Sequence, residues 1–158
     1  MITAFRSTLP TRWFEGLKGI EPVNVDVNDA AAVSEQQIRL LVDLFYDKVR
    51  ADPDLGPIFE RVIKDEWGPH LQKMYDFWSS VMLTTGRYKG QPVVAHKRIE
   101  GLEIGLFDRW LALFGESCDE LLDETTAGLF WLKAVRIAES LKFALFYRPG
   151  RPWPMGAA

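Results

Sequence analysis

Apolar residues recur every three or four positions over most of this chain, which is the period of an amphipathic α-helix. No segment shows the strict apolar–polar alternation that is typical of a half-buried strand. The predicted helices span residues 34–52, 67–84, 92–100, 106–118 and 126–147. The fold class expected from this pattern is all-α.

Capping and proline positions set the predicted helix boundaries. Ser34 and Gln37 have the spacing of a capping box, in which each side chain accepts a hydrogen bond from the other residue's backbone N–H. Pro69 and Pro92 lack a backbone N–H and are tolerated in the first turn of a helix, so each marks a helix start. Residues 55–59 are predicted to form a tight corner that delivers a phenylalanine to the interior.

The pattern divides the chain into one domain and two flanking segments. Residues 34–147 are expected to form the domain, and residues 148–158 a flexible tail with three prolines. Residues 1–33 are expected to be a partly disordered extension. They carry one weak amphipathic pattern, formed by Trp13, Phe14, Leu17 and Ile20.

Composition excludes several functional classes. The 158 residues are 47% hydrophobic, which suits one well-buried core. A formal charge of −3 argues against nucleic-acid and anionic-membrane partners, which require a basic face. No apolar run of about 18 residues is present, so no membrane span is expected. The single cysteine, Cys118, cannot form an internal disulfide, and a cytoplasmic location is expected.

The chain has only two histidines, His70 and His96, and both lie within helical apolar patterns. Either could be a hydrogen-bonded core residue. Together they also suit haem, whose five-coordinate iron takes one neutral imidazole and keeps its other face open for a gas. A non-haem iron site is a second possibility, because Glu66 and His70, and His96 and Glu100, are each four residues apart. No third inward carboxylate is apparent, and haem is the preferred interpretation.

Four further residues gain a role if haem is present. Tyr46 and Trp110 lie on inner helix stripes, and their O–H and N–H groups could donate to a bound dioxygen. Phe59 could pack on the porphyrin, and Met74, one turn after His70, could line the same cavity. As core residues, all four need no such role. No motif for nucleophilic catalysis or phosphate binding is present.

Several motifs resemble those of the group III truncated haemoglobins. Residues 41–59 read LVDLFYDKVRADPDLGPIF and are similar to the second helix and corner of that family. The resemblance continues with WGPHLQKMYDFW over residues 67–78, YKGQPVVAH over 88–96 and FDRWL over 107–111. It covers about residues 34–147 and implies a shortened globin fold, a two-over-two helical sandwich around haem b.

The resemblance also implies site residues. His96 matches the axial iron ligand and His70 the distal histidine, on the side where gas binds. Tyr46 matches the distal tyrosine that bonds the bound gas, and Trp110 a tryptophan of the same pocket. The expected haem contacts are His96, His70, Trp110, Phe59, Met74, Phe77 and Tyr88. Arg87, Tyr88 and Lys97 lie near enough in the sequence to be candidates for contact with the haem propionates, and as surface groups they need no such role.

The function implied is binding of O₂, and also NO or CO, by a cytoplasmic monomer. The activity expected is NO detoxification, in which O₂ and NO give nitrate and an outside reductase returns the electron. Tyr46, His70 and Trp110 would be its catalytic residues. Peroxidase-like chemistry with His70 moving the proton, a non-enzymatic O₂ carrier or gas sensor, and a helical interaction domain without a cofactor are the alternatives.

Overall fold

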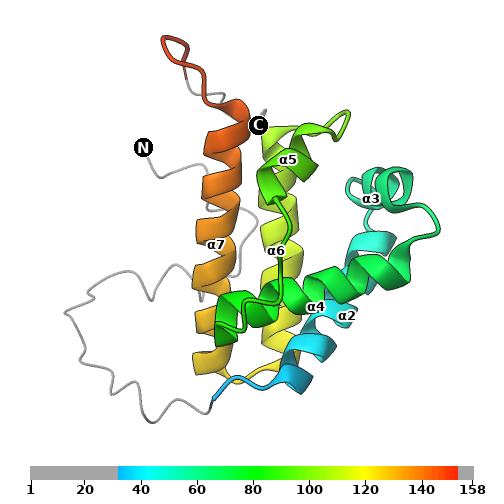
Figure 1. Ribbon diagram of the computed structural model, residues 1–158, viewed down its shortest axis with the longest axis vertical. Helices are drawn as coiled ribbons and strands as arrows, with labels where there is room; N and C mark the ends of the chain where they lie inside the picture. Colours follow the sequence, from blue (N-terminus) through cyan, green and yellow to red (C-terminus); the bar gives the residue numbers. More distant parts are fainter. Residues whose placement is uncertain (1–31, 153–158) are drawn as a thin grey trace. The chain divides into compact units, whose positions relative to one another are not determined.

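A computed structural model describes residues 32–152 of the protein (Figure 1). Within this range the helices are α2 (Glu35–Ala51), α3 (Gly56–Ile63), α4 (Trp67–Leu83), α5 (Pro92–Lys97), α6 (Ile104–Leu121) and α7 (Glu124–Phe146). The four long helices coincide with predicted ones. Most of the expected N-terminal extension and the end of the expected tail lie outside the described residues, as does the pattern of Trp13, Phe14, Leu17 and Ile20.

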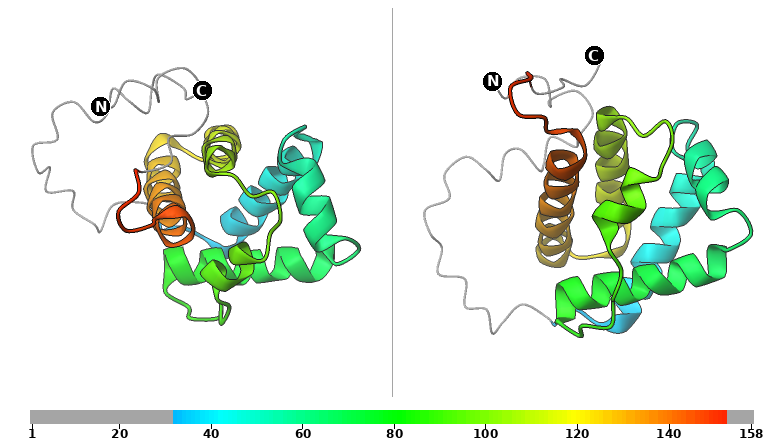
Figure 2. Two further views of the ribbon diagram at one scale, coloured as in Figure 1. Left: turned by 90° about the horizontal axis from the view of Figure 1, so that it is seen from above. Right: turned by 45° about the horizontal axis from the view of Figure 1, so that its top comes forward.

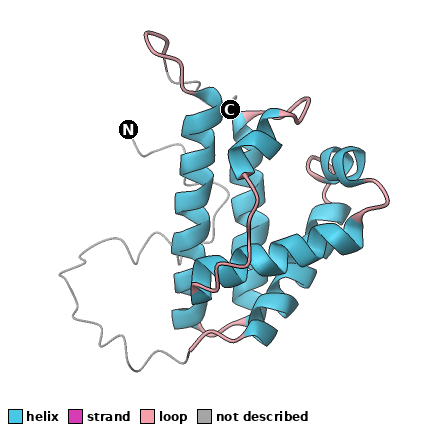
Figure 3. Cartoon of the chain, viewed as in Figure 1, coloured by secondary structure: helices cyan, strands magenta, loops and turns pink. Residues whose placement is uncertain are grey.

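The long helices pack in two pairs. α6 lies along α7, and α2 packs against α4, while α6 also contacts α2 (Figures 1 and 2). The short helix α5 follows the loop that leaves α4 and packs against α7. Residues 32–152 contain helices, turns and loops but no strand (Figure 3), so the prediction of an all-α fold is confirmed.

Helix α2 shows how the sequence pattern becomes structure. Gln37 N donates to Ser34 Oγ at 3.1 Å and Ser34 N donates to Gln37 Oε1 at 2.9 Å, which is the predicted capping box. One face of the helix is buried along its whole length, through Ile38, Leu41, Val42, Phe45, Tyr46 and Val49. Removal of this apolar area from water is what stabilises the helix in the protein.

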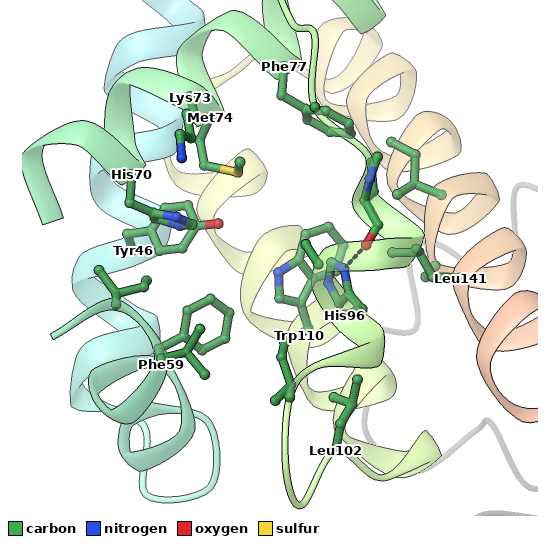
Figure 4. A pocket seen from close by; sticks show the side chains of 18 of the residues that line it. Tyr46, Phe59, His70, Lys73, Met74, Phe77, His96, Leu102, Trp110 and Leu141 are labelled. Atoms are coloured by element: carbon green, nitrogen blue, oxygen red, sulfur yellow. Dashed lines mark hydrogen bonds between the residues drawn. The ribbon is translucent and has the colours of Figure 1, made fainter. Parts of the chain in front are cut away.

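Helix α4 buries far less of its inner face. Only Trp78 and Ser79 are fully buried, whereas His70, Met74 and Phe77 are half-buried. Those three side chains face a cavity instead of a packed neighbour (Figure 4). The apolar stripe of α4 is therefore divided between the core and the wall of that cavity.

Several predicted boundaries differ from the structure. Most of the predicted corner, residues 56–59, belongs to α3, an eight-residue helix with Pro57 in its first turn, and α7 begins two residues earlier than predicted. Helix α5 ends at Lys97, earlier than predicted, and α6 extends from Ile104 to Leu121 at both ends of its predicted range. The bounds of short helices and of helix ends depend on packing as much as on the sequence period, because few backbone hydrogen bonds within the helix hold these residues.

A buried carboxylate joins the end of α2 to α6. Asp52 Oδ1 accepts hydrogen bonds from Leu55 N at 2.9 Å and Asp54 N at 3.0 Å, and Oδ2 accepts from Arg109 Nε at 2.7 Å. Burial alone would raise the pKa of Asp52, but the hydrogen bonds from Leu55, Arg109 and Asp54 outweigh it and lower that pKa. Asp52 thus links the turn that precedes α3 to Arg109 on α6.

Two further observations complete the description of the fold. Cys118 is fully buried, and burial, with the nearby charge of Asp119, raises the pKa of its thiol to about 12. Among residues 32–152, no helix combines the length and apolar character needed to cross a bilayer.

Candidate functional site

A cavity of about 680 Å³ lies between the helices, with α2, α3 and α4 on one side and α5, α6 and α7 on the other (Figure 4). This volume falls within the range of roughly 300–1,000 Å³ that is usual for sites of small molecules and cofactors. The residues expected to contact the haem or the bound gas all line it: Tyr46, Phe59, His70, Met74, Phe77, Tyr88, His96 and Trp110. Folding therefore brings together residues that are up to 64 positions apart, from Tyr46 to Trp110.

His96 extends into the cavity from α5. Its Nδ1 lies 2.7 Å from the carbonyl oxygen of Pro92, one helical turn earlier (dashed line in Figure 4). A carbonyl oxygen can only accept, so Nδ1 is the donor, and in the neutral imidazole Nε2 is then the nitrogen with the free lone pair. The ring of Phe107 lies 6.2 Å from the imidazole, measured between centroids. Such an imidazole, oriented through its other nitrogen, has the arrangement usual for a metal ligand.

Tyr46 and His70 lie together on the opposite side of the cavity. Their ring centroids are 5.1 Å apart and the rings meet at 85°, edge to face. The Tyr46 hydroxyl points into the cavity (Figure 4) and has no hydrogen-bond partner among residues 32–152. Burial raises the pKa of Tyr46, so the phenol keeps its proton and remains a donor.

His70 is neutral at physiological pH. Burial, and then the positive charge of Lys73, lowers the pKa of His70 to about 4. Its Nε2 is buried and makes no hydrogen bond within the described part of the chain. An unpaired polar atom in such a position is uncommon in a folded protein and indicates a place where a ligand or water binds.

Trp110 is held by a stack of aromatic rings. Its indole lies parallel to Phe114, with centroids 5.4 Å apart, and Phe114 stacks in turn on Trp78 at 4.8 Å. Phe45 packs edge-on against both Trp110 and Phe114, at 5.3 Å from each. Since Trp78 and Phe114 are fully buried, the orientation of Trp110 is set by the core behind it.

The loop between α4 and α5 is tied down where it passes the cavity. Tyr88 N donates to Ser80 Oγ at 3.0 Å, and the Tyr88 ring packs edge-on against Phe77 at 5.1 Å. Gly90 leaves room for this ring, because a Cβ at Gly90 would lie 2.2 Å from the Tyr88 hydroxyl oxygen and the ring would have to move. Burial raises the pKa of Tyr88. Tyr88 is thereby fixed against the wall of the cavity.

The charged residues at the cavity differ from those suggested by sequence proximity. Arg87 pairs with Glu35, and its Nε lies 3.7 Å from Asp76 Oδ1. Neither Arg87 nor Lys97 lines the cavity. Two other cations do line it, Lys73 and Lys89. Lys73 could have been found in the sequence, since it lies three residues after His70 and hence on the same helix face.

The residues present fit a haem better than a non-haem metal. In residues 32–152, no three side chains of the His, Cys, Asp and Glu types lie close enough together to hold a metal ion. Haem needs a single protein nitrogen for its iron, an apolar slot for its flat ring and cations near its acidic edge. The cavity offers all three. Nε2 of His96 is the nitrogen, the wall that includes Phe59 and Phe77 is apolar, and Lys73 and Lys89 are the cations.

Comparison with known proteins gives a consistent result. No family model matches the chain. The protein "Group 3 truncated hemoglobin ctb" of Campylobacter jejuni is 34% identical over 117 residues, which cover 72% of this chain and 92% of that protein. The crystal structure of group III truncated hemoglobin from Campylobacter jejuni aligns with a TM-score of 0.71 and 33% identity, covering 78% of this chain and 98% of the other. The fold, the cavity and this likeness agree: the chain belongs to the group III truncated haemoglobins, haem globins that bind diatomic gases.

Proposed function

We propose that this globin holds haem b through His96, binds O₂ on the side of Tyr46 and His70, and uses it to convert NO to nitrate. The observation that carries the proposal is the hydroxyl of the buried residue Tyr46, which points into the cavity without a partner among residues 32–152. When bound, haem supplies an iron that binds O₂ and oxidises NO to nitrate, with one electron returned by a reductase per turnover.

On the His96 side, the contribution of the chain is orientation. The Pro92 carbonyl accepts from Nδ1 and leaves Nε2 as the nitrogen that would bind the iron. Both atoms belong to the same short helix, so the imidazole is aligned by local structure. Lys73 and Lys89 would meet the propionates, and Phe59, Met74, Phe77 and Tyr88 would contact the ring of the haem.

The second contribution of the chain is hydrogen bonding. The Tyr46 phenol and the Trp110 indole are donors at the cavity wall, and both would bond the partly negative oxygen of the bound gas. Both donors are held in place before the gas binds, because Tyr46 is buried and Trp110 is held by its aromatic stack. Donors placed in advance in a water-poor cavity stabilise developing charge most effectively.

The state of His70 favours dioxygenation over the peroxidase alternative. A general acid–base works best with a pKa near the operating pH, so that it can both take and return a proton. Burial lowers the pKa of His70 to about 4, which makes the imidazole a weak proton acceptor at neutral pH. As a neutral group, His70 can still bond the gas or limit entry to the cavity.

Rapid mixing tests the activity. The haem-loaded ferrous protein in oxygenated buffer is mixed with NO, and the haem spectrum and nitrate are followed. We expect conversion to the ferric spectrum within the mixing time, with nitrate formed in proportion to haem. Persistence of the oxygenated spectrum would instead support a carrier or sensor. The cytoplasmic location, the monomeric state and the reductase remain predictions from the sequence.

A further inference from the structure

Trp67 forms a three-ring cluster with the two residues proposed to face the gas. Its indole lies 6.1 Å from the Tyr46 ring at 66°, and 5.9 Å from the His70 imidazole at 88°. Tyr46 and His70 contact each other at 5.1 Å. Each pair thus meets edge to face, the arrangement that aromatic quadrupoles favour. Trp67 is absent from the cavity wall, so it supports the other two rings from behind.

The outer face of this indole is covered by a cation from another helix. Arg50 Cζ lies 4.4 Å from the centre of the Trp67 ring, a cation–π contact. Arg50 Nε in turn donates to Glu60 Oε1 at 3.1 Å. Glu60, Arg50 and Trp67 belong to α3, α2 and α4, so the contact joins the helices that enclose this side of the cavity.

The indole N–H does not explain the presence of Trp67. Trp67 Nε1 is buried and makes no hydrogen bond to any described residue. A buried donor without a partner lowers stability, because it has lost its bond to water. The contribution of this residue is therefore the area of its ring, which fills the space between Arg50 and the pair Tyr46 and His70.

We propose that Trp67 is a positioning residue: clamped by Arg50 and Glu60, its ring fixes the orientations of Tyr46 and His70 toward the bound gas. The inference rests on the proposed function, since it concerns how the gas-facing donors are held. Without the indole, both rings gain room to rotate, and the donor of Tyr46 meets the gas in only part of the molecules.

Trp67→Leu tests this in the haem-loaded full chain. The readouts are the C–O stretching band of the CO complex, which reports the polarity around the gas, and the O₂ dissociation rate. We expect the band to shift and broaden and the rate to rise by roughly threefold to tenfold. Arg50→Gln should move both in the same direction by a smaller amount, roughly twofold for the rate.

The chain offers a matched control. Arg39 Cζ lies 4.7 Å from the centre of the Tyr75 ring, a second cation–π pair between α2 and α4, and Tyr75 does not line the cavity. Arg39→Gln should change thermal stability as Arg50→Gln does, and leave the band and the rate unchanged. Should Arg39→Gln move them equally, the effect is general loosening and the inference is overturned.

The proposed function and the inference fail in different ways. If Tyr46→Phe changes the band and the rate while Trp67→Leu and Arg50→Gln do not, the positioning role is overturned and the proposed function stands. If Tyr46→Phe also has no effect, the proposed function fails with it. Should Trp67→Leu not bind haem, Arg50→Gln decides alone, because Arg50 is half-exposed and its loss leaves the core intact.

Discussion

Nδ1 of His96 lies 2.7 Å from the carbonyl oxygen of Pro92, within a helix of only six residues. Pro92 has two roles in this short segment. It begins the helix, and its carbonyl oxygen accepts the hydrogen bond that orients the His96 imidazole. Nε2 is therefore the nitrogen left for a metal, and local structure alone defines it.

Removal of the His96 imidazole should abolish normal haem binding. For His96→Gly we expect haem affinity to fall by at least about 100-fold, because the iron loses its protein ligand. Free imidazole should restore the Soret band by entering the space left behind. His70→Gly is the control and should keep the band. An unchanged haem spectrum in His96→Gly would show that another residue holds the iron.

Removal of the Tyr46 hydroxyl should accelerate release of O₂. A hydrogen bond worth about 1–2 kcal/mol corresponds to a rate increase of roughly tenfold for Tyr46→Phe, measured by rapid mixing. Thermal stability should be kept or slightly raised, because this hydroxyl has no partner within residues 32–152. Tyr88→Phe alters another tyrosine of the cavity wall and should leave the rate nearly unchanged. Equal rates in Tyr46→Phe and the unmodified protein would refute the donor role.

The pKa of His70 predicts a pH-dependent stability. Burial, and then Lys73, lowers it to about 4 in the folded protein, whereas in the unfolded chain it lies near the ordinary value of about 6.5. The unfolded state therefore binds this proton first as pH falls, and the free energy of unfolding decreases from about pH 6.5 toward about pH 4. The slope stays below the limit of about 1.4 kcal/mol per pH unit for one proton, since His70 is partly exposed.

Urea unfolding between about pH 7 and about pH 5 measures this slope above the range in which most carboxyl groups titrate. His70→Gln cannot take up the proton, so its slope should be smaller than that of the unmodified protein. Parallel slopes would contradict a lowered pKa at His70. Stability from the Asp52 carboxylate, whose pKa is also lowered, should be lost at more acidic pH, as that group becomes protonated.

Gly90→Ala should disturb the cavity through Tyr88. The new Cβ would lie 2.2 Å from the Tyr88 hydroxyl oxygen and 2.4 Å from Cζ, so the ring must leave its contact with Phe77. We expect a loss of about 1–3 kcal/mol in thermal unfolding and weaker haem binding. Gly105→Ala is matched in chemistry, and a Cβ there meets nothing within 4 Å. The free energy of unfolding of Gly105→Ala should rise by up to about 1 kcal/mol. Equal behaviour of the two variants would refute the steric argument.

The sequence was sufficient for the four long helices and for several residues of the cavity wall. A helix is held by hydrogen bonds between residues four apart, so its stripe, cap and proline boundaries are all visible locally. The α2 stripe, the Ser34 cap and the two histidines are local features of this kind. The motif resemblance then suggested roles for Tyr46, His96 and Trp110, and the structure places these three residues at one cavity.

What the sequence could not decide depends on how helices cross. The sequence does not predict helix α3, because its eight residues form only about two turns and show too little of a helical apolar period. Arg87 is a candidate for the propionates by its place in the sequence, yet it pairs with Glu35, a residue 52 positions earlier. The contact of Arg50 with Trp67 joins two helices in the same way. Contacts of this kind depend on the distance and crossing angle between packed helices. Side-chain packing determines both quantities, and a local sequence pattern does not contain them.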